Sequence, residues 1–148
     1  MNLPQETTYL GIDYGERRIG LAVSDPTGLV ARSYKTVLVA SVPDAVRQLD
    51  REIQSIAPVG IIVGYPVSPS GDTGGERCRM VDGFIEELEK IAHIPIYRED
   101  ERHSSAEAAK LLGRKSFREK RRKTGRIDQA AAAIILQSWL DDNAISGS

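Results

Sequence analysis

The stretch Leu10-Gly-Ile-Asp-Tyr-Gly-Glu-Arg-Arg-Ile-Gly-Leu-Ala-Val-Ser24 decides how the rest of the chain is organised. A short apolar run ends in an aspartate, a charged glycine-containing turn follows, and apolar residues then alternate with small ones. Alternation with a period of two around a glycine turn predicts an antiparallel hairpin. One face of the second strand carries only Gly20, Ala22 and Ser24, so we expect a helix to pack closely against it.

Asp13 is the unusual residue of this hairpin, because it places a carboxylate at the end of the first core strand. Such a carboxylate is costly unless it is hydrogen-bonded, paired or bound to a metal. One interpretation is a turn aspartate that bonds the backbone near Tyr14 and Gly15. The other is a functional acid, which would require further acids to meet Asp13 in space.

Length and composition predict one globular domain spanning residues 1–148, with an ordered core over about residues 8–142. The chain has 148 residues, of which 41% are hydrophobic and 28% charged. Its apolar runs are too short to span a bilayer, and Met1 to Thr8 lacks the apolar core of a signal peptide. Cys78 is the only cysteine, which excludes an intrachain disulfide and a cysteine metal cage. We therefore expect a cytoplasmic protein without membrane association.

Hydrophobic periodicity predicts the remaining elements. Strands are expected over residues 29–39, 59–63 and 94–97, and helices over residues 42–56, 78–91, 104–112 and 127–140. Ser41 followed by Asp44 resembles a capping box. Three antiparallel strands followed by crossover units (βββαβαβα) predict an α/β fold of three layers, with a mixed five-stranded sheet and helices on both faces.

Two further places supply acids. Asp128 lies in the first turn of the last predicted helix and continues the apolar stripe of Ala132, Ile135 and Trp139, so its carboxylate should face the sheet. Complementing the helix dipole is the alternative role of this acid. The run Glu99-Asp100-Glu101 follows the last predicted strand, at the edge where open α/β sheets bind ligands.

Carboxylates gathered at one sheet edge repel each other unless a cation intervenes. Oxygen ligands without Cys or clustered His favour Mg²⁺ or Mn²⁺. Two such ions can activate water and stabilise the leaving oxygen of a phosphodiester. Asp100 and Glu101 would point to opposite sides of an extended backbone, so the sequence leaves the choice between these two ligands open.

A basic segment indicates a nucleic-acid partner. Residues 114–126 contain eight Lys or Arg and one Glu, a local charge of +7 in a chain of net charge -1. A solvated surface run is the alternative interpretation. The predicted nucleic-acid contacts are Arg17, Arg18, Arg114, Lys115, Arg118, Lys120, Arg121, Arg122, Lys123 and Arg126. Glycines of the loop over residues 67–75 could offer amides to a phosphate, although a simple connector explains them equally well.

With these residues assembled, the chain resembles the YqgF family, also called RuvX, of RNase H-like pre-16S rRNA nucleases and Holliday-junction resolvases. The matching pieces are Gly11-Ile-Asp-Tyr-Gly15 with Arg18-Ile-Gly-Leu-Ala22, Val63-Gly-Tyr-Pro66, Asp100-Glu-Arg102, and Ile127-Asp128 with residues 130–136. The resemblance covers nearly the whole chain. Two departures are Tyr65, where an aliphatic residue is usual, and His103, where an apolar residue is common; His103 could shuttle protons or simply face solvent.

The resemblance implies metal-dependent phosphodiester hydrolysis. Asp13, Glu101 (or Asp100) and Asp128 would be the metal ligands, and Arg102 would orient a carboxylate or a phosphate. It also implies a role in maturing the 5′ end of pre-16S rRNA, with precursor rRNA and ribosomal particles as partners. The sequence leaves open whether the protein is a monomer or a homodimer.

Three alternatives accompany this hypothesis. The first is a Holliday junction resolvase acting on branched DNA. The second is a non-catalytic nucleic-acid or ribosome-binding module, which would bind RNA in a salt-sensitive way without cutting it. The third is a phosphate-handling domain of the sugar-kinase and actin type, but those proteins need a second lobe for which this chain has no room.

Overall fold

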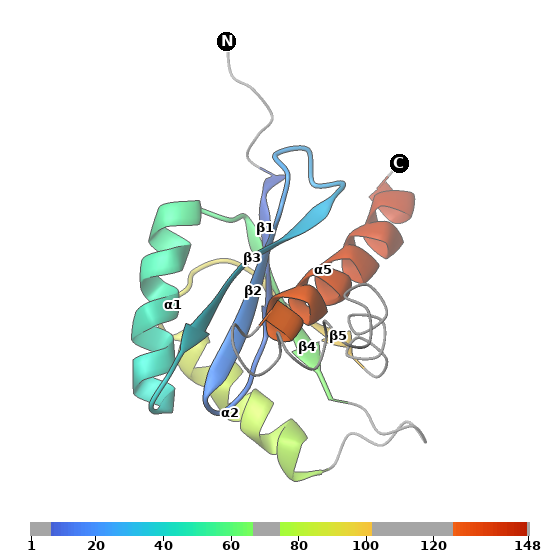
Figure 1. Cartoon of the computed structure of the whole chain (residues 1–148). Coiled ribbons are helices and arrows are strands. Elements are labelled where there is room, and N and C mark those ends of the chain that lie inside the picture. The colour runs from blue at the N-terminus through green and yellow to red at the C-terminus, as the bar shows by residue number, and fades with distance from the viewer. Residues whose placement is uncertain (1–6, 67–74, 102–125, 148) are drawn as a thin grey trace.

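The computed structural model describes residues 7–66, 75–101 and 126–147, which form a mixed sheet of five strands in the order β3-β2-β1-β4-β5 (Figure 1). β1 pairs antiparallel with β2 and parallel with β4, and β5 extends the parallel part. This confirms the predicted mixed α/β fold. The elements are β1 (Tyr9–Asp13), β2 (Arg18–Ser24), β3 (Ala31–Leu38), α1 (Val42–Ile56), β4 (Gly60–Tyr65), α2 (Glu76–Glu89), β5 (Ile96–Asp100) and α5 (Arg126–Gly147).

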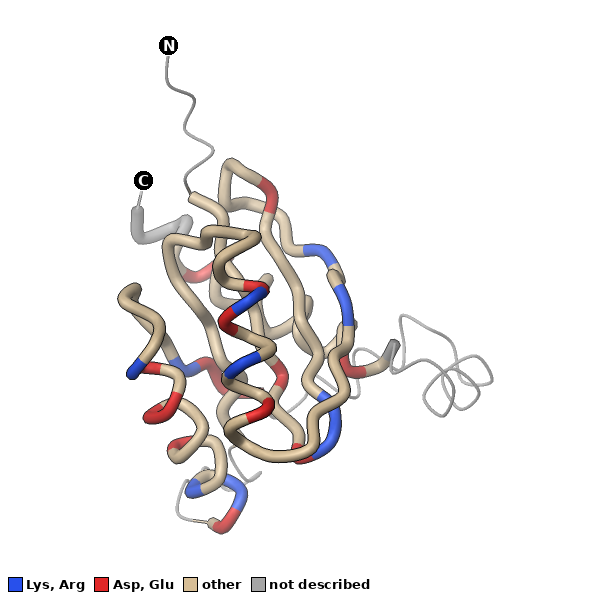
Figure 2. Tube along the Cα trace, turned by 90° about the vertical axis from the view of Figure 1, so that its left-hand side faces the viewer, with Lys and Arg blue, Asp and Glu red and all other residues tan. Residues whose placement is uncertain are grey.

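The helices cover both faces of the sheet, as predicted. α1 and α2 lie side by side over one face (Figure 2), where Leu10 and Ile12 of the sheet pack with Leu49 and Phe84 of the helices. α5 covers the other face, where the apolar core is made by Ala22, Ile62, Ala132, Ile135, Leu136 and Leu140. Since strand residues alternate between faces, β1, β2, β3 and β4 contribute residues to both cores. In the described part of the chain, no helix combines the length and the apolarity needed to cross a bilayer.

The ends of α1 show how local sequence positions the elements. The Ser41 side chain accepts a hydrogen bond from the Asp44 amide at 3.2 Å, which confirms the predicted cap. The helix ends at Ala57, which is in the left-handed conformation (φ 53°) and donates its amide to the Ile53 carbonyl. Pro58 directly afterwards cannot continue the helix, so the chain turns back into β4.

Several predicted boundaries are wrong, including those of β4 (Gly60–Tyr65 rather than residues 59–63) and α2 (Glu76–Glu89 rather than residues 78–91). β3 begins at Ala31 rather than at residue 29, because the Asp25 carboxylate accepts the amides of Leu29 and Val30 and holds both in a turn. The last strand covers Ile96–Asp100 rather than residues 94–97, because the parallel ladder with β4 continues to the end of that strand. α5 continues to Gly147, well beyond residue 140.

α5 approaches the sheet at backbone distance, as the small residues of β2 predicted. A Cβ atom on Gly20 would overlap the carbonyl group of Asp128 and would lie 2.8 Å from the Gln129 nitrogen. Only glycine leaves room for the first turn of α5 at this position. Gly20 therefore determines how closely Asp128 approaches the sheet.

Candidate active site

Asp13 ends β1 and lies opposite Gly20 of β2. Ile12 points into the core under α1 and α2, so the Asp13 side chain points to the face covered by α5. Its carboxyl group is hydrogen-bonded to Glu101. Asp13 is therefore part of a side-chain cluster drawn from distant parts of the chain, as the functional interpretation requires.

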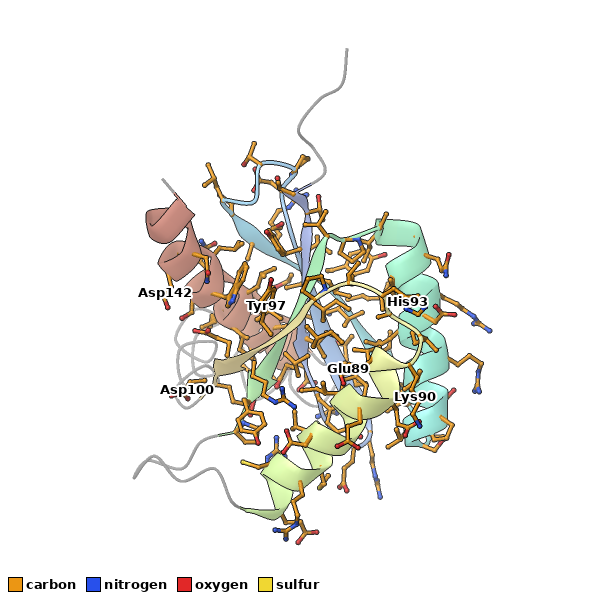
Figure 3. The ribbon with its side chains drawn as sticks, turned by 180° about the vertical axis from the view of Figure 1, so that it is seen from behind. Glu89, Lys90, His93, Tyr97, Asp100 and Asp142 are labelled. Carbon is orange, nitrogen blue, oxygen red and sulfur yellow. The ribbon has the colours of Figure 1, made fainter. Side chains whose placement is uncertain are left out.

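The structure brings Glu101 to Asp13 and turns Asp100 away. Tyr97 contacts Trp139 and Glu99 accepts from Ser138, so odd-numbered residues of β5 face α5. Asp100, the last residue of the strand (Figure 3), takes the opposite face by alternation. The Glu101 amide donates to the Tyr65 carbonyl at 3.1 Å, which carries the extended path one residue beyond the strand.

Gly64 makes the room that Glu101 needs. A Cβ atom at this position would lie 2.8 Å from Oε1 of Glu101, so the carboxylate rests directly over the β4 backbone. The Glu101 side chain keeps only 14% of its surface exposed. Glu99 and Asp100, predicted to follow the last strand, belong instead to that strand, and Glu101 comes directly after it.

Asp128 completes the cluster from the first turn of α5. Nε of Arg18 lies 3.1 Å from Oδ2 of Asp128, so β2 supplies a cation directly to this acid. Arg18 was predicted to contact nucleic acid, and in the structure it pairs with Asp128. The aligned burial of Ala132 and Ile135 confirms that Asp128 lies on the apolar side of its helix.

The electrostatics of Asp13 reflect this crowding. The pKa of Asp13 is raised to about 8, first by burial and then by the charges of Glu101 and Asp128, against a smaller opposing effect of Arg77. Burial also raises the pKa of Glu101, which Arg77 opposes. Without a cation, Asp13 is therefore protonated near neutral pH and shares its proton with Glu101.

The cluster suits a hard cation by its chemistry. Asp13, Glu101 and Asp128 offer only oxygen donors, the type that Mg²⁺ and Mn²⁺ prefer. In addition to burial, the charges of Glu101 and Asp128 raise the pKa of Asp13, and a divalent cation could replace the shared proton. Among residues 7–66, 75–101 and 126–147, no three His, Cys, Asp or Glu side chains are already arranged as a metal centre.

Arg77, in the first turn of α2, is a member of the site that the sequence did not indicate. Its Nη2 atom lies 3.7 Å from Oε2 of Glu101. An arginine that follows a glycine-rich connector has no distinctive pattern, and only the packing of α2 against the sheet brings it to the acids. Gly75 serves as the N-cap of α2 without a side-chain cap.

Tyr65, one of the two departures from the family pattern, makes contacts that an aliphatic residue could not make. Its hydroxyl donates to Oδ2 of Asp82 at 2.9 Å, and Arg98 donates to Oδ1 of Asp82 at 3.0 Å and 3.2 Å. Arg98 also lies over the Tyr65 ring, 5.6 Å from its centre. These contacts tie the end of β4 to α2 and β5, the elements that carry Arg77 and Glu101. Cys78, buried beside them, donates to the Pro66 carbonyl at 2.8 Å and is a core residue, as predicted.

We predict that Tyr65→Phe lowers the free energy of unfolding by about 1 kcal/mol, because Asp82 loses one of its hydrogen-bond donors. The matched control is Tyr34→Phe, which removes a similar bond of 3.0 Å to Glu52 on the surface and should cost less than about 0.5 kcal/mol. Urea unfolding of both variants measures the difference. Equal costs would contradict a structural role for the Tyr65 hydroxyl.

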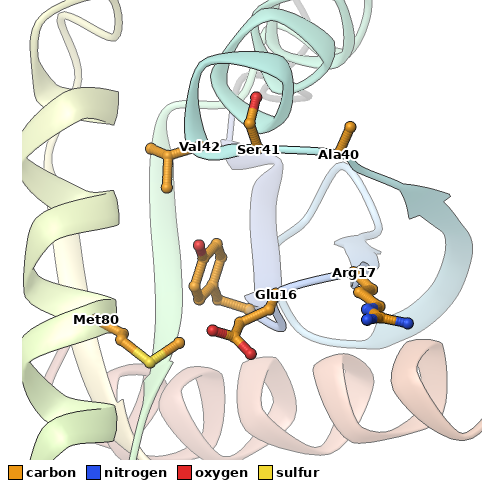
Figure 4. Close-up of a pocket in the computed structure, with 7 residues that line it drawn as sticks. Glu16, Arg17, Ala40, Ser41, Val42 and Met80 are labelled. Atoms are coloured by element: carbon orange, nitrogen blue, oxygen red, sulfur yellow. The ribbon is translucent and has the colours of Figure 1, made fainter.

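Of the remaining predicted site residues, Arg17 lies apart from the acids, and most of the others lie outside the part of the chain that the structure describes. Arg17 does not join the acids and instead lines a hollow of about 450 Å³ with Tyr14, Glu16, Ser41, Val42 and Met80 (Figure 4). Outside the described residues lie Arg102, His103, the predicted helix over residues 104–112 and the basic segment over residues 114–125. Arg126 begins α5, but its side chain is not described.

Comparison with known proteins identifies relatives that match along most of the chain. The family model described as RuvX, Holliday junction resolvase, matches residues 7–142. A protein of Syntrophus aciditrophicus named "Putative pre-16S rRNA nuclease" is 38% identical over 132 residues, which are 89% of this chain and 87% of the relative. A protein of Salinibacter ruber with the same name is 37% identical over 141 residues, covering 94% of this chain and 96% of the relative.

Solved structures share the fold at low sequence identity. Thermus thermophilus RuvC in complex with a Holliday junction substrate superimposes with a TM-score of 0.56 at 16% identity, covering 93% of this chain and 96% of RuvC. The fowlpox virus resolvase in complex with Holliday junction DNA gives a TM-score of 0.58 at 11% identity, covering 93% and 99% of the two chains. The fold is therefore the RNase H-like fold of these resolvases.

Proposed function

Because the chain belongs to the RuvX family, we propose that it is a metal-dependent endonuclease that processes the 5′ end of pre-16S rRNA during ribosome biogenesis. The observation that carries this proposal is the hydrogen-bonded pair of Asp13 and Glu101 with Asp128 beside it. The relatives' names support a ribosomal precursor as substrate. Such a role implies a cytoplasmic protein that works on nucleic acid or on ribosomal particles.

In this proposal Asp13, Glu101 and Asp128 hold Mg²⁺ or Mn²⁺, and a pair of such ions would suit phosphodiester hydrolysis. When bound, the ions supply charge stabilisation and an activated water for phosphodiester hydrolysis. The chain's own residues then have defined tasks. Gly20 and Gly64 let Asp128 and Glu101 approach Asp13, and Arg18 orients the Asp128 carboxylate.

Cleavage of branched DNA is the second candidate. The description of the matching family as Holliday junction resolvase favours it, and the shared RuvC fold is compatible with it. The acid cluster serves both substrates equally well, since it acts on the phosphodiester and not on the base. Substrate choice must come from other residues.

One assay tests the proposal and separates the candidates. We expect the protein to cut precursor rRNA in the presence of Mg²⁺ or Mn²⁺, to lose all cutting in EDTA, and to regain it when metal is restored. A four-way DNA junction and a single-stranded RNA are compared under the same conditions. Preferential cutting of the junction would favour the resolvase. Salt-sensitive binding without any cutting would leave a non-catalytic module.

A further inference from the structure

The Arg77 side chain is largely exposed, although it contacts the nearly buried carboxylate of Glu101. Nη2 lies 3.7 Å from Oε2 of Glu101, whose side chain is only 14% exposed, whereas the Arg77 side chain is 61% exposed. An arginine carries five N–H donors in a planar fork, so a contact to one carboxylate does not use all of them. The pair partly neutralises Glu101, and the exposed part of the Arg77 side chain remains available to a ligand.

A second arginine approaches the acids from the other side. Arg18 of β2 lies 3.1 Å from Asp128 and its side chain is 39% exposed. In the sheet order, β2 and β5 flank β1 and β4, so Arg18 and Glu101 with Arg77 lie on opposite sides of Asp13. The acid cluster is therefore bordered by one guanidinium group on each side.

A nucleic-acid strand that reaches this cluster brings further negative charge to acids that already crowd one another. Cations directly beside the acids reduce this repulsion, and a guanidinium fork matches two phosphate oxygens better than a lysine does. Acidic and basic residues are interspersed along α1 and α2 (Figure 2). Arg77, in the first turn of α2, contacts the cluster directly.

We infer that Arg77 contacts a backbone phosphate of the nucleic-acid substrate at the Asp13–Glu101 pair. The inference rests on the proposed function, because it assumes that nucleic acid is the substrate of this cluster. One edge of the guanidinium group stays on Glu101, and the other edge binds two oxygens of the phosphate. Arg77 thereby positions the strand over the carboxylates.

The test compares Arg77→Met and Arg77→Lys with Arg47→Met as the matched control. Arg47 is also 61% exposed and also pairs with an acid, which in its case is Asp44 of the same helix, α1. Binding of a fluorescein-labelled RNA containing the 5′ precursor segment is measured by anisotropy in EDTA at several salt concentrations. We expect Arg77→Met to weaken binding about tenfold and to reduce the salt slope by about one, with Arg47→Met within about twofold of wild type.

The lysine variant tests the fork geometry. Arg77→Lys keeps the positive charge and should therefore have the salt slope of wild type. Because lysine lacks the planar fork of arginine, cleavage in Mg²⁺ should stay about tenfold below wild type. Recovery of full cleavage with lysine would overturn bidentate contact.

The outcomes also separate this inference from the proposed function. If wild type binds and cuts while Arg77→Met binds like Arg47→Met, the inference is wrong and the nuclease function stands. If wild type binds without cutting and Arg77→Met still binds more weakly, the contact stands and the nuclease function is wrong. A wild-type protein that does not bind nucleic acid overturns both.

Discussion

Asp13→Asn is expected to reduce cleavage by a factor on the order of 10³ or more while leaving nucleic-acid binding within a few-fold of wild type. Asp13 lies between Glu101 and Asp128, so its loss removes the carboxylate that the other two share. Losing several kcal/mol of charge stabilisation at the reacting phosphate corresponds to such a factor. Cleavage of precursor rRNA in Mg²⁺ and binding in EDTA are the two measurements. Full activity of this variant would contradict the proposed site.

The same substitution should make the metal-free protein more stable. The pKa of Asp13 is raised from 3.8 to about 8, so the folded state holds a proton that the unfolded chain releases at lower pH. The favourable contribution of protonated Asp13 is complete below pH 3.8 and is lost as the pH rises towards 8. Asparagine does not titrate and still donates to Glu101. The stability gain of Asp13→Asn should therefore grow with pH, reaching roughly 2–4 kcal/mol near pH 8.

Asp25→Asn provides the control of opposite sign. The side-chain bond from Thr27, followed by backbone amides such as that of Val30, lowers the pKa of Asp25 to about 2. Its stabilisation is present above the unfolded pKa and is lost as the pH falls towards 2, so this variant should be less stable than wild type at neutral pH. Urea unfolding in EDTA between pH 5 and 8 measures both variants. A gain for Asp13→Asn that does not change with pH would contradict the assigned protonation.

Adding Mg²⁺ should reverse the order of stability of wild type and Asp13→Asn. A cation that binds only the folded state stabilises wild type, whereas the asparagine variant has lost a ligand and should respond less. This readout does not depend on cleavage. Equal stabilisation of both proteins by Mg²⁺ would place the cation elsewhere.

The first hairpin and its packing against a helix could be predicted from the sequence. Alternation around the Tyr14-Gly15 turn predicted the antiparallel pair, and the small residues of β2 predicted a closely packed helix, which is α5. The position of Asp128 on an apolar stripe predicted an acid facing the sheet. These inferences succeeded because each depends on local periodicity, which the chain expresses directly.

The choice between Asp100 and Glu101 could not be made from sequence, because it depends on the register between β4 and β5. A shift of one residue would exchange the faces of the two acids, and nothing local to that run determines it. Arg77 was missed for a related reason. Its position depends on the tilt of α2, which the contacts among Tyr65, Asp82 and Arg98 help to hold.

Gly20→Ala is expected to destabilise the protein by about 3 kcal/mol or more, although it adds a single methyl group. That methyl group would overlap the Asp128 carbonyl and press on the Gln129 amide, which are backbone atoms of α5 and cannot rotate away. Relief requires the first turn of α5 to move off the sheet, and Asp128 would move with it. We therefore expect the folded fraction of this variant to have lost most of its cleavage activity as well.

Gly83→Ala is the matched control for this clash. Gly83 is exposed in the interior of α2, and a Cβ atom there meets nothing within 4 Å. Alanine should stabilise the helix at this position by about 0.5–1 kcal/mol, since it has the higher helix propensity. Urea unfolding of the two variants should give changes of opposite sign. A Gly20→Ala protein as stable as wild type would mean that α5 does not lie against β2 at backbone distance, and Asp128 would then have no fixed place beside Asp13.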